Sequence, residues 1–67
     1  MSDNVNNPRQ FSGIDFIGER VIKARLAGVH WRVVNRDGIP QVVTQDCNFN
    51  RYNFYVVDGF ITKQYMG

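Results

Sequence analysis

The strongest alternation of apolar and polar residues in the chain runs over residues 51–57. An apolar residue recurs at every second position, which is the period of a β-strand with one buried face. The inward positions of this predicted strand are Tyr52, Phe54 and Val56, and the outward positions are Arg51, Asn53, Tyr55 and Val57. The pair Asp58-Gly59 follows and favours a tight hairpin, so we expect a further strand over residues 60–65.

A short helix is predicted earlier in the chain, over residues 19–26. Gly28 lies just past its end, where a left-handed residue commonly terminates a helix. The residues expected to share one face by helical spacing are Val21, Ile22, Arg25 and Leu26. Two turns of helix are unstable alone in water, so contacts with the rest of the domain must hold them.

Another strand is predicted over residues 30–35, with Trp31 and Val33 on one face and Arg32 on the other. The following pair Asp37-Gly38 suits a turn with positive φ. Together the elements indicate an α+β domain in which one short helix packs on a small mixed sheet. The direction of the first strand relative to the second stays open, although their connection is long enough for a parallel pair.

Two further segments carry weaker signals. Residues 1–10 are polar and lack periodicity, so we expect a disordered arm before a domain that spans residues 11–67. This domain is expected to begin with a loop over residues 11–18 that packs its rings inward. Residues 39–50 contain β-branched side chains but begin beside Pro40 and lie between turns. They are either an ordinary edge strand or a long functional connection.

Composition limits the compartment and the class of partner. The chain has 67 residues, enough for one domain, and its net charge of +2 is too small to indicate nucleic acid by itself. Its single cysteine cannot form an internal disulfide, and its polar N-terminus does not resemble a signal peptide. No stretch approaches the roughly 18 apolar residues of a membrane span. We therefore expect a cytoplasmic protein more than a secreted one, with no membrane partner.

Five basic residues fall close together over residues 20–36, with Glu19 the one acid grouped with them. They are either ordinary solvated surface residues or a weak phosphate-binding patch. The residues in question are Arg20, Lys23, Arg25, Arg32 and Arg36.

Cys47 and His30 are the residues that would suggest catalysis or metal binding. A Cys–His pair would also need an orienting carboxylate and a cleft, which a chain of this size hardly provides. One cysteine and one histidine are too few for a structural zinc site. We expect no enzyme activity, no metal and no cofactor. Cys47 is expected to be an exposed, inert thiol, with a disulfide between two chains as the alternative.

Residues 43–56 resemble the reactive loop and following strand of the potato-inhibitor-I family, most closely its short bacterial and fungal serine-peptidase-inhibitor branch. The positions in register with the family pattern are Thr44, Asp46, Asn50 and Arg51. Phe16-Ile17-Gly18-Glu19 is similar to the family's opening before its helix. Asp58-Gly59-Phe60-Ile61 and Gly67 are similar to its closing hairpin. The resemblance covers residues 14–67.

This resemblance implies an inhibitory binding protein with an extended, protruding loop that fills the cleft of a serine peptidase. Gln45 would enter the primary specificity pocket, and Gln45-Asp46 would be the bond presented at the tip. Arg51 would support Thr44 and Asp46 from beneath, and Asn53 would be a second anchor. From its position, Phe49 is expected to be an apolar anchor under the loop. The implied partner-binding loop consists of Val43, Thr44, Gln45, Asp46, Cys47 and Asn48.

The chain departs from the family pattern at two loop positions, and Gln45 is an unusual residue for the specificity pocket. Cys47 stands where the family has an aromatic residue, and Asn48 stands where it often has a supporting arginine. A same-fold protein that blocks a non-peptidase target, such as a host or phage protein, is therefore an alternative, and a nucleic-acid binder is a weaker one. Tyr55 and Val57 are either ordinary exposed strand residues or a dimer patch. Both a monomer and a homodimer remain open.

Overall fold

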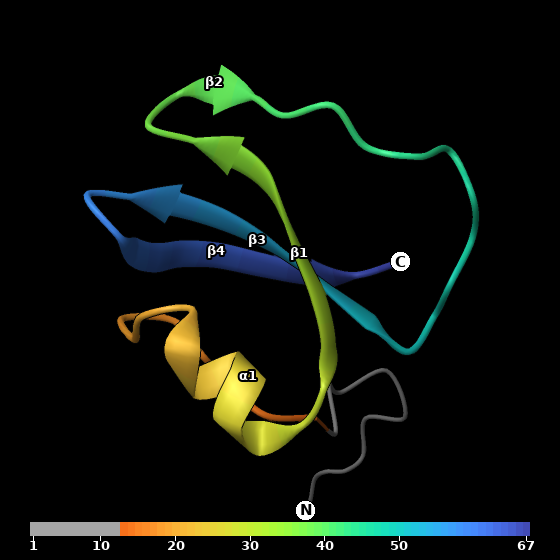
Figure 1. Ribbon diagram of the computed structural model, residues 1–67, viewed down its shortest axis with the longest axis horizontal. Helices are drawn as coiled ribbons and strands as arrows, with labels where there is room; N and C mark the ends of the chain where they lie inside the picture. Colours follow the sequence, from red (N-terminus) through yellow and green to blue (C-terminus); the bar gives the residue numbers. More distant parts are fainter. Residues whose placement is uncertain (1–12) are drawn as a thin grey trace, which may run out of the picture.

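The computed structural model describes residues 13–67, so the predicted disordered arm and the start of order at Phe11 lie outside the described residues. The described chain is a small α+β domain with a four-stranded mixed sheet, as predicted (Figure 1). The strand order in the sheet is β2-β1-β3-β4. The elements are α1 (Ile22–Ala27), β1 (His30–Arg36), β2 (Ile39–Pro40), β3 (Arg51–Val57) and β4 (Phe60–Met66).

The two central strands, β1 and β3, run parallel, which answers the question that the sequence pattern left open. Their register places His30 beside Arg51 and Arg32 beside Asn53. The connection between them first turns back as the two-residue edge strand β2 and then continues as an irregular segment over residues 41–50. Most of residues 39–50 is therefore a loop rather than an edge strand.

Two hairpins flank this parallel pair, and both have the predicted turn residues. Asp37 and Asp58 each adopt a φ of 52°, and the glycine after each is also left-handed. The backbone N–H of Asp58 donates a hydrogen bond to Asp37 Oδ1 at 2.8 Å, so the two turns are tied together at one end of the sheet. The hairpin predicted at Asp58-Gly59 and the positive-φ turn predicted at Asp37-Gly38 are confirmed.

The core lies between α1 and one face of the sheet (Figure 1). Phe54 is completely buried, and the ring of Phe16 meets it edge-to-face at a centroid distance of 5.6 Å. Trp31 stacks on the same ring at 6.1 Å. Such aromatic pairs contribute about 0.5–1.5 kcal/mol each beyond the area that they bury. The inward positions predicted for β3, and the inward packing of a ring from the segment before the helix, are confirmed.

The helix differs from its prediction in extent and in the face that it buries. It spans six residues and ends at Gly28, whose φ is 73°. Ala24 is fully buried against the core, whereas Ile22 and Leu26 are 43% and 75% exposed. The predicted shared face of Val21, Ile22, Arg25 and Leu26 is therefore wrong. The small side chain of Ala24 lets the short helix approach the sheet closely, so larger side chains remain at its margins.

The residues before α1 pair with β4 instead of extending the helix. Gly18 N–H donates to Ile61 O at 2.7 Å, and Ile61 N–H donates to Glu19 O at 2.8 Å. The second bond uses the Glu19 carbonyl oxygen, which in a helix beginning at residue 19 would accept from Lys23 N–H. The described part of the chain contains no helix with the length and apolar character needed to cross a membrane.

Candidate functional site

The candidate site is the loop over residues 43–48, which lies over the sheet face opposite the helix. The chain runs from β2 through a long arc to the start of β3 (Figure 1). Because side chains alternate along β3, Arg51 and Asn53 point away from the core and toward this loop. Both are nevertheless buried, with exposed fractions of 6% and 0%. At this end of β3, the side chains predicted to point outward are therefore buried too, and they form a polar layer beneath the loop.

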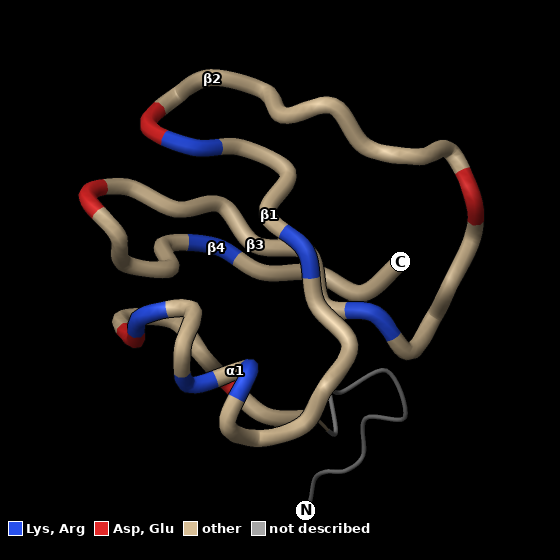
Figure 2. Tube along the Cα trace, viewed as in Figure 1, with Lys and Arg blue, Asp and Glu red and all other residues tan. Residues whose placement is uncertain are grey.

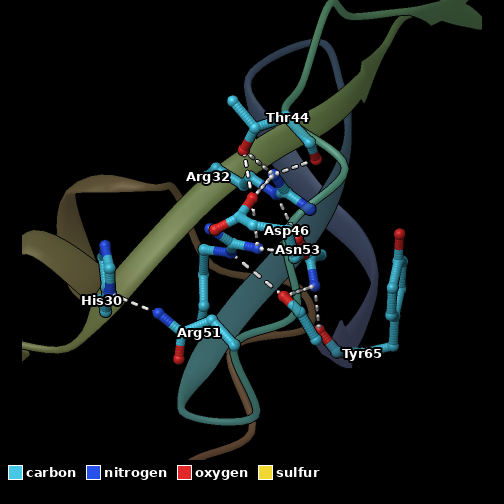
Figure 3. A network of polar contacts seen from close by, with 9 residues as sticks. His30, Arg32, Thr44, Asp46, Arg51, Asn53 and Tyr65 are labelled. Carbon is cyan, nitrogen blue, oxygen red and sulfur yellow. Dashed lines mark hydrogen bonds and ion pairs between the residues drawn. The ribbon is translucent and has the colours of Figure 1, made fainter.

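Arg51 lies beneath Asp46 and holds it with its planar guanidinium group (Figure 3). Its Nη1 donates to Asp46 Oδ2 at 3.1 Å, and its Nη2 donates to the backbone oxygen of Asp46 at 3.2 Å. Its Nε donates to Gly67 O at 3.0 Å. One side chain therefore joins the loop to the end of β4 through charge-assisted bonds, which are stronger than neutral ones.

Arg32 from β1 holds Thr44, the residue before Gln45 (Figure 3). Its Nη1 donates to the backbone oxygen of Thr44 at 3.1 Å and to the Thr44 hydroxyl at 3.3 Å. The same Nη1 lies 3.9 Å from Asp46 Oδ1. By sequence, Arg32 is one of the surface basic residues, and the family resemblance implies that Arg51 supports Thr44. The structure gives that support to Arg32.

Asn53 links this second arginine to the last strand. Its Oδ1 accepts a hydrogen bond from Arg32 Nε at 2.6 Å. Its Nδ2 donates to Tyr65 O at 3.2 Å and to Gly67 O at 3.0 Å. The amide does not touch the loop directly, as the predicted second anchor would. It orients Arg32, which does.

Asp46 is the acidic centre of the network. Its pKa is lowered from 3.8 to about 2, first by the hydrogen bond from the Thr44 hydroxyl and then by that from Arg51. Each bond stabilises the ionised carboxylate and is lost when the group is protonated. The carboxylate therefore joins Thr44, on the other side of Gln45, to Arg51 beneath the loop.

The depressed pKa of Asp46 predicts how the loop responds to acid. Because the pKa is lower in the folded protein than in the unfolded chain, ionised Asp46 stabilises the loop fully above about pH 4 and loses that effect as the pH falls toward about 2. Carboxyl-carbon NMR should give a titration midpoint near 2 for Asp46. Thr44→Val, which removes the hydroxyl donor, should raise this midpoint. A wild-type midpoint at 3.8 would contradict the network.

Asn48 closes the far end of the loop. Its side-chain oxygen accepts from Asn50 N–H at 3.0 Å, and its backbone oxygen accepts from Arg51 N–H at 3.1 Å. Its Nδ2 lies 3.3 Å from His30 Nδ1, which accepts when the imidazole proton is on Nε2. His30 is thus a neighbour of the loop rather than a partner of Cys47, which is exposed.

The predicted role of Phe49 as an apolar anchor under the loop is wrong, because its side chain is 78% exposed. The space beneath the loop is occupied by the guanidinium groups of Arg32 and Arg51 and by the amide of Asn53. Such a polar layer offers an aromatic ring no apolar surface. Phe49 instead lies in the turn that Asn48 closes, with its ring in solvent.

Gln45, between the two tethered residues, is exposed. Its side chain makes no hydrogen bond within residues 13–67. The backbone N–H groups of residues 42–45 and of Cys47 likewise donate to no group in the described chain. Both side-chain and backbone polar groups of the tip are therefore available to a partner.

The other four basic residues of the predicted phosphate-binding patch take no part in this network. Arg20 lies over the ring of Phe60, 4.4 Å from its centroid, and Lys23, Arg25 and Arg36 are exposed. The separation of these charges from the loop arginines can be followed in Figure 2. Arg32 belongs to the support of the loop, so its guanidinium group is not free to bind phosphate.

Comparisons of the chain with family models, with characterised proteins and with solved structures found no match.

Proposed function

We propose that this protein inhibits a serine peptidase by presenting residues 43–48 to the active-site cleft as a preorganised, substrate-like segment. One observation carries the proposal: Thr44 and Asp46 are both tied down to the sheet, whereas Gln45 between them is exposed. This arrangement offers one side chain to a specificity pocket and one peptide bond, Gln45–Asp46, to the nucleophile. The resemblance to the potato-inhibitor-I family supports the same interpretation.

The two arginines explain how such a loop could bind tightly. A flexible peptide loses conformational freedom when it docks, and a loop already held in its bound shape loses much less. Arg32 holds the segment before the exposed bond, and Arg51 holds the segment after it. Even if the Gln45–Asp46 bond were hydrolysed, these contacts would keep the two new ends together, which favours resynthesis of the bond over release.

The unpaired backbone of the loop supports a peptidase as partner. Peptidases commonly bind an extended substrate through main-chain hydrogen bonds, in the manner of strand addition. The free N–H groups of residues 42–45 and of Cys47 provide donors for such bonds. Cys47 and Val43 on either side of the tethered triplet would then lie at the rim of the contact.

A panel of purified serine peptidases tests the proposal. The wild-type protein and Gln45→Leu should be titrated against subtilisin-like and chymotrypsin-like enzymes, with residual activity as the readout. Leucine suits the apolar pockets of these enzymes, so Gln45→Leu should inhibit them more strongly than the wild type does. Mass spectrometry of the complex should find any slow cleavage at the Gln45–Asp46 bond and nowhere else.

A matched control uses a residue outside the loop network. Arg25→Ala removes an exposed helix arginine and should leave inhibition unchanged. If neither the wild type nor Gln45→Leu inhibits any member of the panel, the peptidase proposal fails. Capture of a non-peptidase protein that survives a Gln45→Ala/Asp46→Ala replacement would instead favour a same-fold protein that blocks another target.

A further inference from the structure

The side chain at the loop tip defines the chemistry of the pocket that receives it. Resting on the proposed function, we infer that the target is a peptidase whose primary pocket hydrogen-bonds an uncharged carboxamide, so that it cleaves after glutamine. The observation is the contrast between Gln45 and its neighbours. The polar groups of Thr44 and Asp46 are used within the chain, whereas the carboxamide of Gln45 is exposed and makes no hydrogen bond within residues 13–67.

A carboxamide brings an oxygen acceptor and two N–H donors into any pocket that it enters. An apolar slot would strip these groups of water and leave them unpaired, which opposes binding. The pocket must therefore supply at least one donor and one acceptor. A pocket of this kind also discriminates strongly, because an analogue without the polar groups leaves the pocket's own buried partners unsatisfied.

The charge around the tip separates a carboxamide pocket from charged ones. A pocket for basic side chains contains a carboxylate, and a pocket for acidic side chains contains a cation. Gln45 is uncharged and would neutralise neither the carboxylate nor the cation. The charged group of such a pocket would therefore be buried without a counter-charge. Asp46 does not change this conclusion, because its carboxylate already faces Arg51 at 3.1 Å and Arg32 at 3.9 Å. The loop therefore offers a pocket an uncharged polar group.

The test uses four tip residues and four peptidases. Wild type, Gln45→Glu, Gln45→Leu and Gln45→Lys should each be titrated against enzymes that cleave after glutamine, after glutamate, after large apolar residues and after basic residues. Against the glutamine-cleaving enzyme we expect wild type to be the strongest inhibitor. Gln45→Glu has nearly the same shape, and Gln45→Leu lacks the polar groups. Both should be weaker by about 100-fold or more.

The outcomes separate this inference from the proposed function. If Gln45→Leu or Gln45→Lys inhibits its matched enzyme but wild type does not inhibit the glutamine-cleaving one, the loop is an inhibitory loop and the carboxamide inference is overturned. Stronger inhibition of the glutamate-cleaving enzyme by wild type than of the glutamine-cleaving enzyme would overturn it as well. If no variant inhibits any of the four enzymes, the proposed function fails and the inference fails with it.

Discussion

Replacing Arg51 with alanine is expected to weaken inhibition about 100-fold, equivalent to about 2.7 kcal/mol of binding free energy, and to convert the protein into a readily cleaved substrate. The buried guanidinium group holds both the carboxylate and the backbone oxygen of Asp46. Without it, Asp46 keeps only the hydrogen bond from the Thr44 hydroxyl and the more distant Arg32 Nη1 at 3.9 Å. The loop then loses conformational freedom on binding, and a cleaved end can leave the active site.

Arg51→Lys is the matched control for this prediction. It keeps the positive charge but not the fork that contacts two acceptors at once, so we expect an intermediate loss of inhibition. Affinity should be measured by titration of peptidase activity, and cleavage of the Gln45–Asp46 bond by mass spectrometry over time. Because Arg51 also donates to Gly67 O, urea unfolding should verify that each variant is folded under the assay conditions. Unchanged affinity in folded Arg51→Ala would contradict the role given to Arg51.

Local patterns were enough to predict the regular part of this fold. The alternation in β3 fixes which side chains face the core, and the two Asp-Gly pairs adopt the positive φ angles expected of tight hairpins. Both features depend on residues close together in sequence. The helix shows the limit of such patterns, because Ala24 gave too weak an apolar signal to compete with Ile22 and Leu26. Which helix residues are buried depends on the distance between the helix and the sheet. The spacing of apolar residues along the helix does not indicate that distance.

The support of the loop could be predicted only in part from the sequence. Arg51 follows the loop directly, and the family pattern placed it there. Arg32 is separated from Thr44 by 12 positions, and its role depends on the parallel pairing of β1 and β3. Once that register is known, the partnership of Arg32 and Asn53 follows, because the two residues are opposite each other and face the same side of the sheet. The prediction for Phe49 was wrong for a related reason. The polar layer beneath the loop forms through strand pairing, and the sequence pattern does not show it.

Asn53→Leu is expected to destabilise the fold by about 3 kcal/mol, because a fully buried amide loses three hydrogen bonds, and their partly buried partners lose theirs. A domain of this size gains only about 3–5 kcal/mol of stability from its core, so the variant should be partly unfolded at room temperature. Urea unfolding followed by Trp31 fluorescence measures the change. Thr62→Ala, which removes an exposed hydroxyl bond at 3.3 Å, should have little effect by comparison.

Asn53→Asp separates the two roles of this amide. The carboxylate keeps an acceptor for Arg32 Nε but loses the donors to Tyr65 O and Gly67 O, so stability should fall while the hold of Arg32 on Thr44 persists. If Asn53 acts on the loop through Arg32, folded Asn53→Asp should inhibit nearly as well as wild type. Arg32→Ala should then cost about 1–2 kcal/mol less binding free energy in the Asn53→Leu background than in the wild type. Equal costs in both backgrounds would show that Asn53 stabilises the sheet without orienting Arg32, and that the loop depends on each residue independently.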